Sequence, residues 1–300
     1  MKNQIIMQIN YAERPGGNFG GRSIDEVCAF AAGLGFNGIE FRGNVPKHLA
    51  GLSFREYAEQ IAAGKKNHGL RTVMFGMDVV GAGSADKDTR DKAVAFAAER
   101  ARIAREVCET EVCNASADWI SAKEAGTPWY RYDLCGSVAI DEDTYNRTVD
   151  TFSRISAELE RIGLRFALET HMGYVHDLPA SARKFVDDVN SPALGINLDY
   201  GNTVYFPNIP SVAEAIDICG DKLFYTHLKN SVGIPETPNL RFPTALGDGQ
   251  INHREYFEKL ISVGYDGLIG VEAPRQGDRL WYAKCDMAYV KDLLADLSEK

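Results

Sequence analysis

The hydrophobic pattern of the chain alternates between two periods along its whole length. Short apolar runs typical of strands are each followed by a segment in which apolar residues recur at helical spacing. Ser23 and Ser53 predict N-caps for two of the helices, and Gly35 predicts the end of the first. The expected strands cover residues 4–10, 36–42, 70–76, 111–116, 164–170, 194–199, 223–229 and 267–273. The expected helices cover residues 23–35, 53–69, 88–108, 142–162, 179–189, 211–219, 252–263 and a segment from 281 onwards.

This order amounts to eight strand–helix units. Strands that alternate with helices are typical of parallel sheets joined by right-handed crossovers. Eight units in 300 residues favour the α/β class and a (β/α)8 TIM barrel, which forms a single domain over residues 1–300. An open doubly wound sheet is the rival, but no GxGxxG motif follows the first strand. Segments 117–141 and 230–250 are too long for simple connections, so we expect functional loops there.

Acidic and imidazole side chains interrupt the apolar runs near the ends of four consecutive strands. The runs "FALE", "GINLD", "FYTH" and "IGVE" end in Glu169, Asp199, His227 and Glu272. In a TIM barrel these positions meet at one mouth, where active sites form. Three converging carboxylates repel one another unless a cation lies among them. Three carboxylates and one imidazole suit Mn²⁺, Mg²⁺ or Co²⁺, whereas Zn²⁺ lacks its characteristic thiolates here. The ordinary alternative for each residue alone is a helix cap or an ion-pair partner.

Composition and charge narrow the classes of protein. Hydrophobic residues make up 45% and charged residues 25%, as in soluble globular proteins. The net charge of -9 argues against nonspecific nucleic-acid binding, which needs a basic surface. No apolar run approaches the length of a membrane helix, and the first residues lack the features of a signal peptide. The six scattered cysteines form no CxxC motif and indicate reduced thiols. We therefore expect a cytoplasmic protein without membrane or nucleic-acid partners.

The segments "LETH", "NLDYGN", "THLKN", "LGDGQIN" and "GVEAP" follow one another in the second half of the chain. With this series the chain resembles the xylose isomerase-like superfamily of sugar isomerases and epimerases, which includes ketose 3-epimerases, inosose dehydratase and endonuclease IV. The resemblance implies that Glu169, Asp199, His227 and Glu272 hold one divalent metal ion, with Mn²⁺ favoured over Mg²⁺, Co²⁺ and Zn²⁺. It also implies that Glu169 and Glu272 move protons on opposite faces of the substrate.

Other residues near strand ends are candidates for substrate binding. His171 either faces the cleft or caps the next helix. Lys229 either reaches substrate oxygens or pairs with a carboxylate of the metal site. Glu40, with its neighbour Arg42, either lines the mouth or joins a salt bridge between loops. Trp129, in the long loop after the fourth strand, either walls a sugar ring or anchors that loop.

Two positions depart from the superfamily's pattern. Asn202 stands where some members have a histidine, and it can bind a sugar hydroxyl but cannot transfer protons. Gly233 stands where the epimerases tend to have an arginine.

Arg275 is a candidate for selecting a carboxylate or phosphate group of the substrate. His176 and His253 are expected to be surface or loop histidines.

These observations favour a divalent-metal-dependent sugar isomerase or epimerase that removes a proton next to a metal-bound carbonyl of a ketose or related keto-polyol. A metal-dependent lyase or dehydratase on a keto-sugar or keto-inositol is the alternative, because it begins with the same step. A nuclease is disfavoured, since "GIEFR", "VMFGM" and "DYGN" lack the histidines that endonuclease IV uses. A sugar-binding protein would bind metal without turnover. Homo-oligomerisation also stays open, because the C-terminal helix could form an interface or pack on the barrel.

Overall fold

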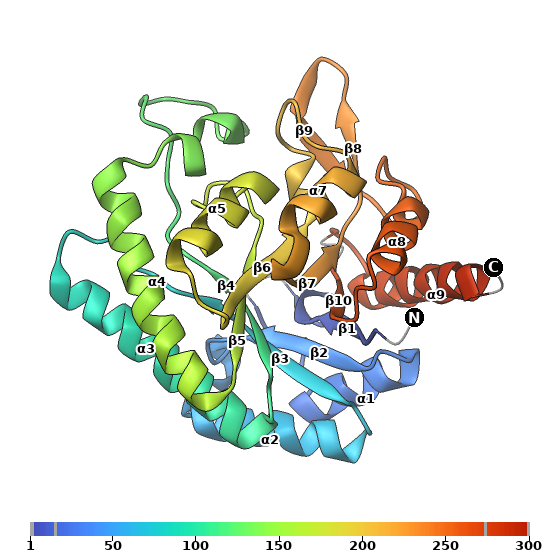
Figure 1. Ribbon diagram of the computed structural model, residues 1–300. Coiled ribbons are helices and arrows are strands. Elements are labelled where there is room, and N and C mark those ends of the chain that lie inside the picture. The colour runs from blue at the N-terminus through green and yellow to red at the C-terminus, as the bar shows by residue number, and fades with distance from the viewer. Residues whose placement is uncertain (1–2, 15–16, 273–274, 299–300) are drawn as a thin grey trace.

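Eight parallel strands form the centre of the molecule and close into a barrel (Figure 1). The computed structural model describes residues 3–14, 17–272 and 275–298. Around the barrel the strands follow the order β1-β10-β7-β6-β5-β4-β3-β2. Their bounds are Ile5–Gln8 (β1), Gly38–Arg42 (β2), Thr72–Asp78 (β3), Val112–Ser116 (β4), Arg165–Glu169 (β5), Leu194–Asp199 (β6), Leu223–Leu228 (β7) and Leu268–Val271 (β10). The expected (β/α)8 TIM barrel is confirmed.

Helices surround the barrel and connect successive strands (Figure 1). Ser23 and Ser53 cap the first two helices as predicted, each in a capping box with the glutamate three residues later. Such a cap contributes about 1 kcal/mol, because it satisfies free backbone N–H groups. Gly35 ends the first helix at a φ of 89°, in the left-handed region. The bounds are Ile24–Leu34 (α1), Phe54–Asn67 (α2), Lys87–Cys108 (α3), Glu142–Ile162 (α4), Pro179–Val189 (α5), Tyr200–Thr203 (α6), Val212–Cys219 (α7), His253–Ser262 (α8) and Arg279–Ser298 (α9).

Two apolar clusters fill the fold, one on each face of the strands. The larger cluster packs strands against helices. The smaller cluster lies inside the barrel and consists of Ile6, Met74, Val112, Ala167 and Tyr225. Val112, Ala167 and Tyr225 are each followed, two residues later on the same face of the strand, by a polar residue. These polar residues are Asn114, Glu169 and His227. The barrel interior is therefore apolar towards the amino ends of the strands and polar at their carboxyl ends.

The segment 230–250 differs from the expected irregular loop. Strands Ser231–Ile234 (β8) and Thr237–Pro243 (β9) pair antiparallel into a hairpin that projects beyond β7 (Figure 1). The strands are short and contain glycine and proline, which hide the alternation that predicts strands. The segment 117–141 contains two short 3-10 turns, Tyr132–Leu134 (η3) and Gly136–Val138 (η4), and is otherwise irregular as expected.

The cysteines are unpaired, as the sequence predicts. All six cysteines are free, and every one except Cys285 is buried. Over the described ranges, no helix combines the length and apolarity needed to cross a bilayer. Ala273 and Pro274, which end the expected eighth strand and the "GVEAP" segment, lie outside the described residues.

Candidate metal centre and cleft

The ends of β5, β6, β7 and β10 bring Glu169, Asp199, His227 and Glu272 together. Asp199 pairs in register with His227, and Glu169 with Asn197, so the side chains project at similar heights. One ligand atom from each of the four residues lies within 4.8 Å of the others. These four residues are called the quartet below.

The donor atoms of the quartet fit a divalent cation. His227 Nδ1 lies 3.0 Å from Glu272 Oε2, 3.5 Å from Asp199 Oδ2 and 3.7 Å from Glu169 Oε2. Asp199 Oδ2 and Glu272 Oε2 are buried, and each lies within ion-pair distance of both His227 Nδ1 and Lys229 Nζ. Three carboxylates held this close repel one another unless positive charge lies among them. Carboxylates and one imidazole are also the donor types that divalent ions such as Mn²⁺ accept. The quartet could therefore hold one ion.

The ammonium group of Lys229 reaches into the same cluster. Its Nζ lies 2.7 Å from Asp199 Oδ2, 3.1 Å from Glu272 Oε2 and 3.5 Å from Glu169 Oε1. Lys229 therefore pairs with carboxylates of the metal site, which is one of the two roles expected from the sequence. Its side chain also lines the cleft. Burial alone would lower the pKa of Lys229, but the three carboxylates raise it well above its usual range. Lys229 is therefore a fixed positive charge beside the quartet.

Burial and neighbouring charges act against each other on the quartet. Burial alone would raise the pKa of Glu169 and Glu272, but Lys229 and His227 lower both. The pKa of Glu169 lies well below its usual range, and that of Glu272 falls to about 2. Burial dominates at Asp199 and raises its pKa, although Lys229 opposes the shift. Both glutamates are therefore ionised at neutral pH, as ligands and proton acceptors must be.

Glu40 lies beneath the quartet and is only 2% exposed. Its Oε2 accepts hydrogen bonds from His227 Nε2 and from the Tyr225 hydroxyl, both at 2.9 Å. Because Nε2 donates to Glu40, Nδ1 is the ring nitrogen left to face the carboxylates. Gly270 makes room for this arrangement, since a Cβ there would overlap the Tyr225 hydroxyl and lie 2.6 Å from His227 Cδ2.

Replacing Glu40 with leucine is expected to weaken metal binding by roughly 10- to 100-fold, because His227 then loses the partner that fixes its tautomer and ring orientation. Titration of metal-free protein with Mn²⁺ in a calorimeter measures the effect. Glu40→Gln is the matched control, since its amide oxygen still accepts the Nε2–H bond and should preserve most of the affinity. Native affinity in Glu40→Leu would show that Glu40 does not prepare His227 for a metal.

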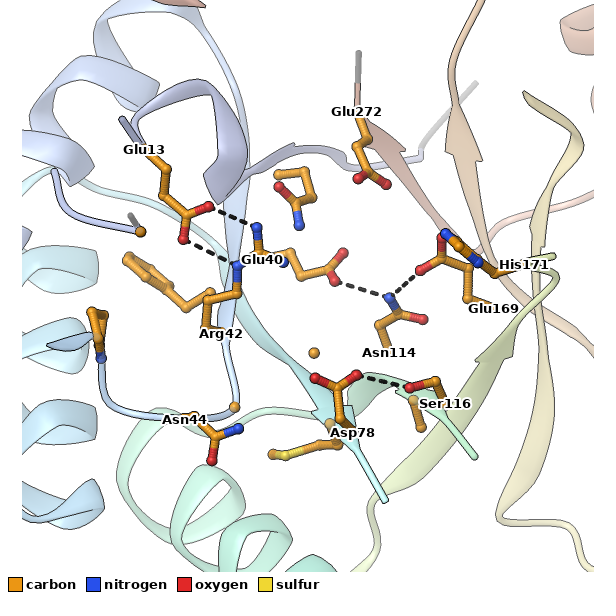
Figure 2. Close-up of a pocket in the computed structure, with 18 of the residues that line it drawn as sticks. Glu13, Glu40, Arg42, Asn44, Asp78, Asn114, Ser116, Glu169, His171 and Glu272 are labelled. Carbon is orange, nitrogen blue, oxygen red and sulfur yellow. Dashed lines mark hydrogen bonds and ion pairs between the residues drawn. The ribbon is translucent and has the colours of Figure 1, made fainter. Parts of the chain in front are cut away.

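Three asparagines that the sequence analysis missed hold the carboxylates in place. Asn114 Nδ2 donates to Glu169 Oε2 at 2.8 Å (Figure 2). Asn197 Nδ2 in turn donates to Asn114 Oδ1 at 3.0 Å, and Asn10 Nδ2 donates to Glu272 Oε1 at 3.2 Å. Asn114 and Asn197 each interrupt an apolar strand, and this polar residue within a buried run was the signal available in the sequence.

His176 lies in the loop between β5 and α5, as one of its two alternatives expected, but it is buried and not at the surface. Its Nδ1 donates to the Glu169 carbonyl oxygen at 2.7 Å, and its Nε2 accepts from the Ala117 N–H at 3.0 Å. A neutral ring satisfies both bonds, because one nitrogen donates and the other accepts. His253 is also buried, against two main-chain carbonyl groups, which corrects the same expectation. Buried backbone groups at strand ends need such partners.

The stability of the protein is expected to fall as the pH is lowered from about 6.5 towards 4, because burial lowers the pKa of His176 from 6.5 to about 4. In this interval the unfolded chain takes up a proton that the folded ring does not, which lowers the free energy of unfolding, by about 2 kcal/mol at pH 5. Urea unfolding at pH 7.5 and pH 5 measures the loss. His176→Gln should lose less than the native protein, and the exposed control His48→Gln should lose as much. An equal loss in all three proteins contradicts the expectation.

A cleft of about 740 Å³ opens above the quartet (Figure 2). This volume lies within the range of small-molecule sites, roughly 300–1,000 Å³. Glu169 and Glu272 line the cleft, and His171 lies beside Glu169 (Figure 2). His171 does not cap the next helix, which begins at Pro179 after Leu178 as its N-cap. Asp78 and Ser116 form a further polar wall, in which the Ser116 hydroxyl donates to Asp78 at 2.8 Å.

Three other candidates do not line the cleft. Trp129 is 69% exposed and packs edge-on against neighbouring tyrosines. Arg275 pairs with the buried Asp286. Asn202 is buried and donates to Glu169 Oε1 at 3.0 Å. The structure therefore places Asn202 as a support for Glu169 and Arg275 in an ion pair away from the cleft.

Comparison with known proteins gives one family match and partial relatives. The family model described as xylose isomerase-like TIM barrel matches residues 28–293. The uncharacterized protein MJ1311 of Methanocaldococcus jannaschii is 30% identical over 125 residues, which are 41% of this chain and 41% of that protein. The inosose dehydratase of Geobacillus kaustophilus is 24% identical over 173 residues, which are 53% of this chain and 56% of the dehydratase. The matches thus span about half of these relatives or less.

Solved structures share the fold over nearly the whole chain. L-ribulose 3-epimerase has a TM-score of 0.75 at 17% identity, over 99% of this chain and 96% of its own. D-psicose 3-epimerase with D-tagatose, from Clostridium cellulolyticum H10, has a TM-score of 0.73 at 18% identity, over 97% and 99%. A xylose isomerase-like protein from Mycobacterium smegmatis in complex with magnesium has a TM-score of 0.73 at 20% identity, over 98% and 97%. Since the family model covers most of the sequence and the barrel is closed, the chain belongs to the xylose isomerase-like TIM barrel family.

Proposed function

We propose that the protein is a divalent-metal-dependent isomerase or epimerase acting on a ketose or related keto-polyol. The observation that carries the proposal is the convergence of three carboxylates and one imidazole at one end of the barrel, with Glu169 and Glu272 of this group lining a cleft. The quartet would hold the ion. Such an ion supplies positive charge next to the carbonyl group whose neighbouring carbon loses a proton. We favour Mn²⁺ over Mg²⁺, Co²⁺ and Zn²⁺.

The two glutamates are the groups proposed to move protons. Each is ionised, and each has a hydrogen bond that fixes its position, from Asn10 to Glu272 and from Asn114 to Glu169. A fixed carboxylate can remove a proton from the carbon next to the carbonyl, and a second carboxylate can return a proton to the substrate. For epimerisation the two must act on opposite faces of the same carbon.

Lys229 and His171 are proposed to bind substrate oxygens. Lys229 lines the cleft with its ammonium beside Glu272, where it can donate to a hydroxyl or to an oxygen that gains negative charge. His171 lines the same cleft, and its Nδ1 contacts the Met172 carbonyl oxygen at 2.9 Å. Its other ring nitrogen is then free to contact a substrate hydroxyl. Asn202 already donates to Glu169 and to the Thr170 carbonyl, so we assign it to support the glutamate.

A metal-dependent lyase or dehydratase is the second candidate. The inosose dehydratase match favours it, together with Asn202, which stands where some superfamily members have a histidine, and Gly233, which stands where the epimerases tend to have an arginine. Elimination of water begins with the same proton removal but then breaks the bond to a neighbouring hydroxyl group. It needs one base and a donor for the departing hydroxide, and Lys229 lies close enough to Glu272 to serve as that donor.

Incubation of the Mn²⁺-loaded protein with ketoses and keto-inositols in deuterated water separates the candidates. Nuclear magnetic resonance and mass spectrometry then follow the products. An isomerase or epimerase introduces deuterium at the carbon next to the carbonyl and keeps the substrate's oxygen atoms. A dehydratase gives a product that has lost one water. Absence of exchange and of water loss across the panel would overturn both, and would leave metal-dependent binding without turnover.

A further inference from the structure

Positive side chains gather on one side of the cleft. Arg14, Lys47 and Arg279 line it, together with Arg42. They follow or end β1, β2 and β10, which are neighbours in the barrel, as β1 pairs with both β2 and β10. Since the whole chain has a net charge of -9, this concentration of positive charge is a local feature.

Most of this charge is not neutralised. Arg42 forms a two-bond salt bridge with Glu13, at 2.6 Å and 3.0 Å (Figure 2). Within the described residues, Arg14, Lys47 and Arg279 form no ion pair. Outside the quartet, the cleft's other acidic side chains are Glu13, Glu40 and Asp78. Glu13 and Glu40 have cationic or imidazole partners, so three unpaired cations face one remaining carboxylate, that of Asp78.

Arg279 is held in place without losing its charge. Its Nη1 donates to the carbonyl oxygens of Asn10 and Glu13, both at 3.1 Å, and its Nε donates to that of Arg275 at 3.3 Å. Carbonyl groups orient a guanidinium but do not cancel its charge, and Nη2 has no bonded partner among the described residues. Such a preorganised group loses little side-chain entropy when an anion binds.

Arg14 is supported from a neighbouring turn. The main-chain N–H of Arg14 donates to the Asn18 carbonyl oxygen at 2.8 Å. Gly20, at a φ of 62°, has no side chain and so leaves the space that the Arg14 guanidinium occupies. A second cavity, of about 450 Å³, adjoins the cleft and shares Glu13, Arg14 and Arg279 with it; its lining adds Arg22 and Asp278, and Glu13 is already paired with Arg42. The group of cations therefore extends from the cleft into a side cavity, which gives room for a charged substituent beyond a sugar chain.

We propose that the natural substrate is an anionic keto-sugar, and that its carboxylate or phosphate binds at Arg14, Lys47 and Arg279. This rests on the proposed function, because it takes the keto group to lie at the quartet. Arginine forks bind both kinds of anion through paired hydrogen bonds. The carboxylates of the quartet repel the same anion, so the charge separation also fixes which end of the substrate enters towards Glu169 and Glu272.

The test compares matched ligands on the Mn²⁺-loaded protein. Calorimetry measures the affinity for D-fructose, D-fructose 6-phosphate and 2-keto-D-gluconate, which represent the neutral, phosphate and carboxylate forms. We expect at least one anionic ligand to bind about tenfold or more tightly than D-fructose, a difference of about 1.4 kcal/mol. The preference should shrink as NaCl is raised, because salt screens charges on the exposed side of the cleft.

Two substitutions locate the preference. Arg14→Gln and Lys47→Gln change exposed side chains, and both should reduce the ratio of anionic to neutral affinity by several-fold. Arg254→Gln is the matched control, since Arg254 pairs with Asp296 on the outer helices and should leave the ratio unchanged. The phosphate and carboxylate ligands, taken separately, show which anion is selected.

The outcomes separate this inference from the proposed reaction. If neither anionic ligand binds more tightly than D-fructose, or if both cleft variants keep the native ratio, the anion site is wrong, even where a neutral ketose is turned over. If the anionic preference is present and depends on Arg14 and Lys47, the site stands. That holds even where no deuterium exchange or water loss is seen, in which case the proposed reaction fails alone.

Discussion

Replacing Glu272 with glutamine is expected to reduce proton exchange on the substrate by a factor of about 10³ or more. Glutamine has nearly the same shape, but it cannot accept a proton and is a weaker metal ligand. Glu272 Oε2 is buried and lies 3.0 Å from His227 Nδ1 and 3.1 Å from Lys229 Nζ. Glu169→Gln should have an effect of the same order. Deuterium exchange in metal-loaded protein measures both.

Glu99→Gln, an exposed substitution on α3, is the control and should keep native exchange. Circular dichroism must show that all variants are folded, so that the loss is assigned to chemistry. If Glu272→Gln exchanges protons at the native rate, the proposed acid–base role is wrong. If it loses exchange but a parallel Glu169→Gln variant does not, only one glutamate is a base, which favours elimination over epimerisation.

Replacing Asp286 with alanine is expected to lower the free energy of unfolding by about 3–5 kcal/mol, as found when one partner of a buried ion pair is removed. Asp286 on α9 is only 1% exposed. It pairs with Arg275, accepts a hydrogen bond from the Tyr11 hydroxyl at 2.6 Å and accepts another from the Leu246 N–H at 3.0 Å. The alanine variant leaves all three of these groups without their partner.

Urea unfolding followed by tryptophan fluorescence measures the loss. Asp292→Ala is the matched control, because Asp292 is exposed on the same helix and should change stability by no more than about 0.5 kcal/mol. Since Tyr11 follows Asn10, which donates to Glu272, the Asp286 variant should also bind metal less tightly. Equal stability of the two variants would show that the contacts of Asp286 with Tyr11, Leu246 and Arg275 do not stabilise the fold.

Much of the fold could be predicted because each strand and helix has its own local signal. Periodicity, serine caps and terminal glycines lie within a few residues of the elements they define, and helix α4 occupies residues 142–162 as expected. The hairpin at 231–243 was missed because its short strands contain glycine and proline and pair only with each other. The hairpin therefore leaves no local hydrophobic pattern in the sequence from which it could be predicted.

The site was predictable only where function interrupts a buried strand. Glu169, Asp199 and Glu272 stand at the ends of apolar runs, so their convergence follows once the barrel is assumed. Glu40 was named as a residue of the mouth or of a salt bridge between loops, and it lies beneath the quartet, hydrogen-bonded to His227. Such partners come from the far side of the barrel, and the sequence does not state which strands face each other across it.

Loop residues were the least predictable. His176 bonds to the backbone of Glu169 at the end of β5 and of Ala117 just after β4, and Arg275 pairs with a residue on the last helix. Both contacts depend on how loops fold over the barrel rim, for which single residues give no periodic signal. Oligomeric state and cytoplasmic location stay predictions from the sequence.

The metal content of the purified protein, beside that of the double variant Glu169→Gln, Glu272→Gln, is the most direct test of the quartet as a metal centre. Both are dialysed against a mixture of Mn²⁺, Mg²⁺, Co²⁺ and Zn²⁺, then against metal-free buffer, and analysed by mass spectrometry of the elements. The account predicts about one divalent ion per native chain, as in a single-metal site, and a trace amount in the variant. Equal metal content in the two proteins, or none in either, would contradict it.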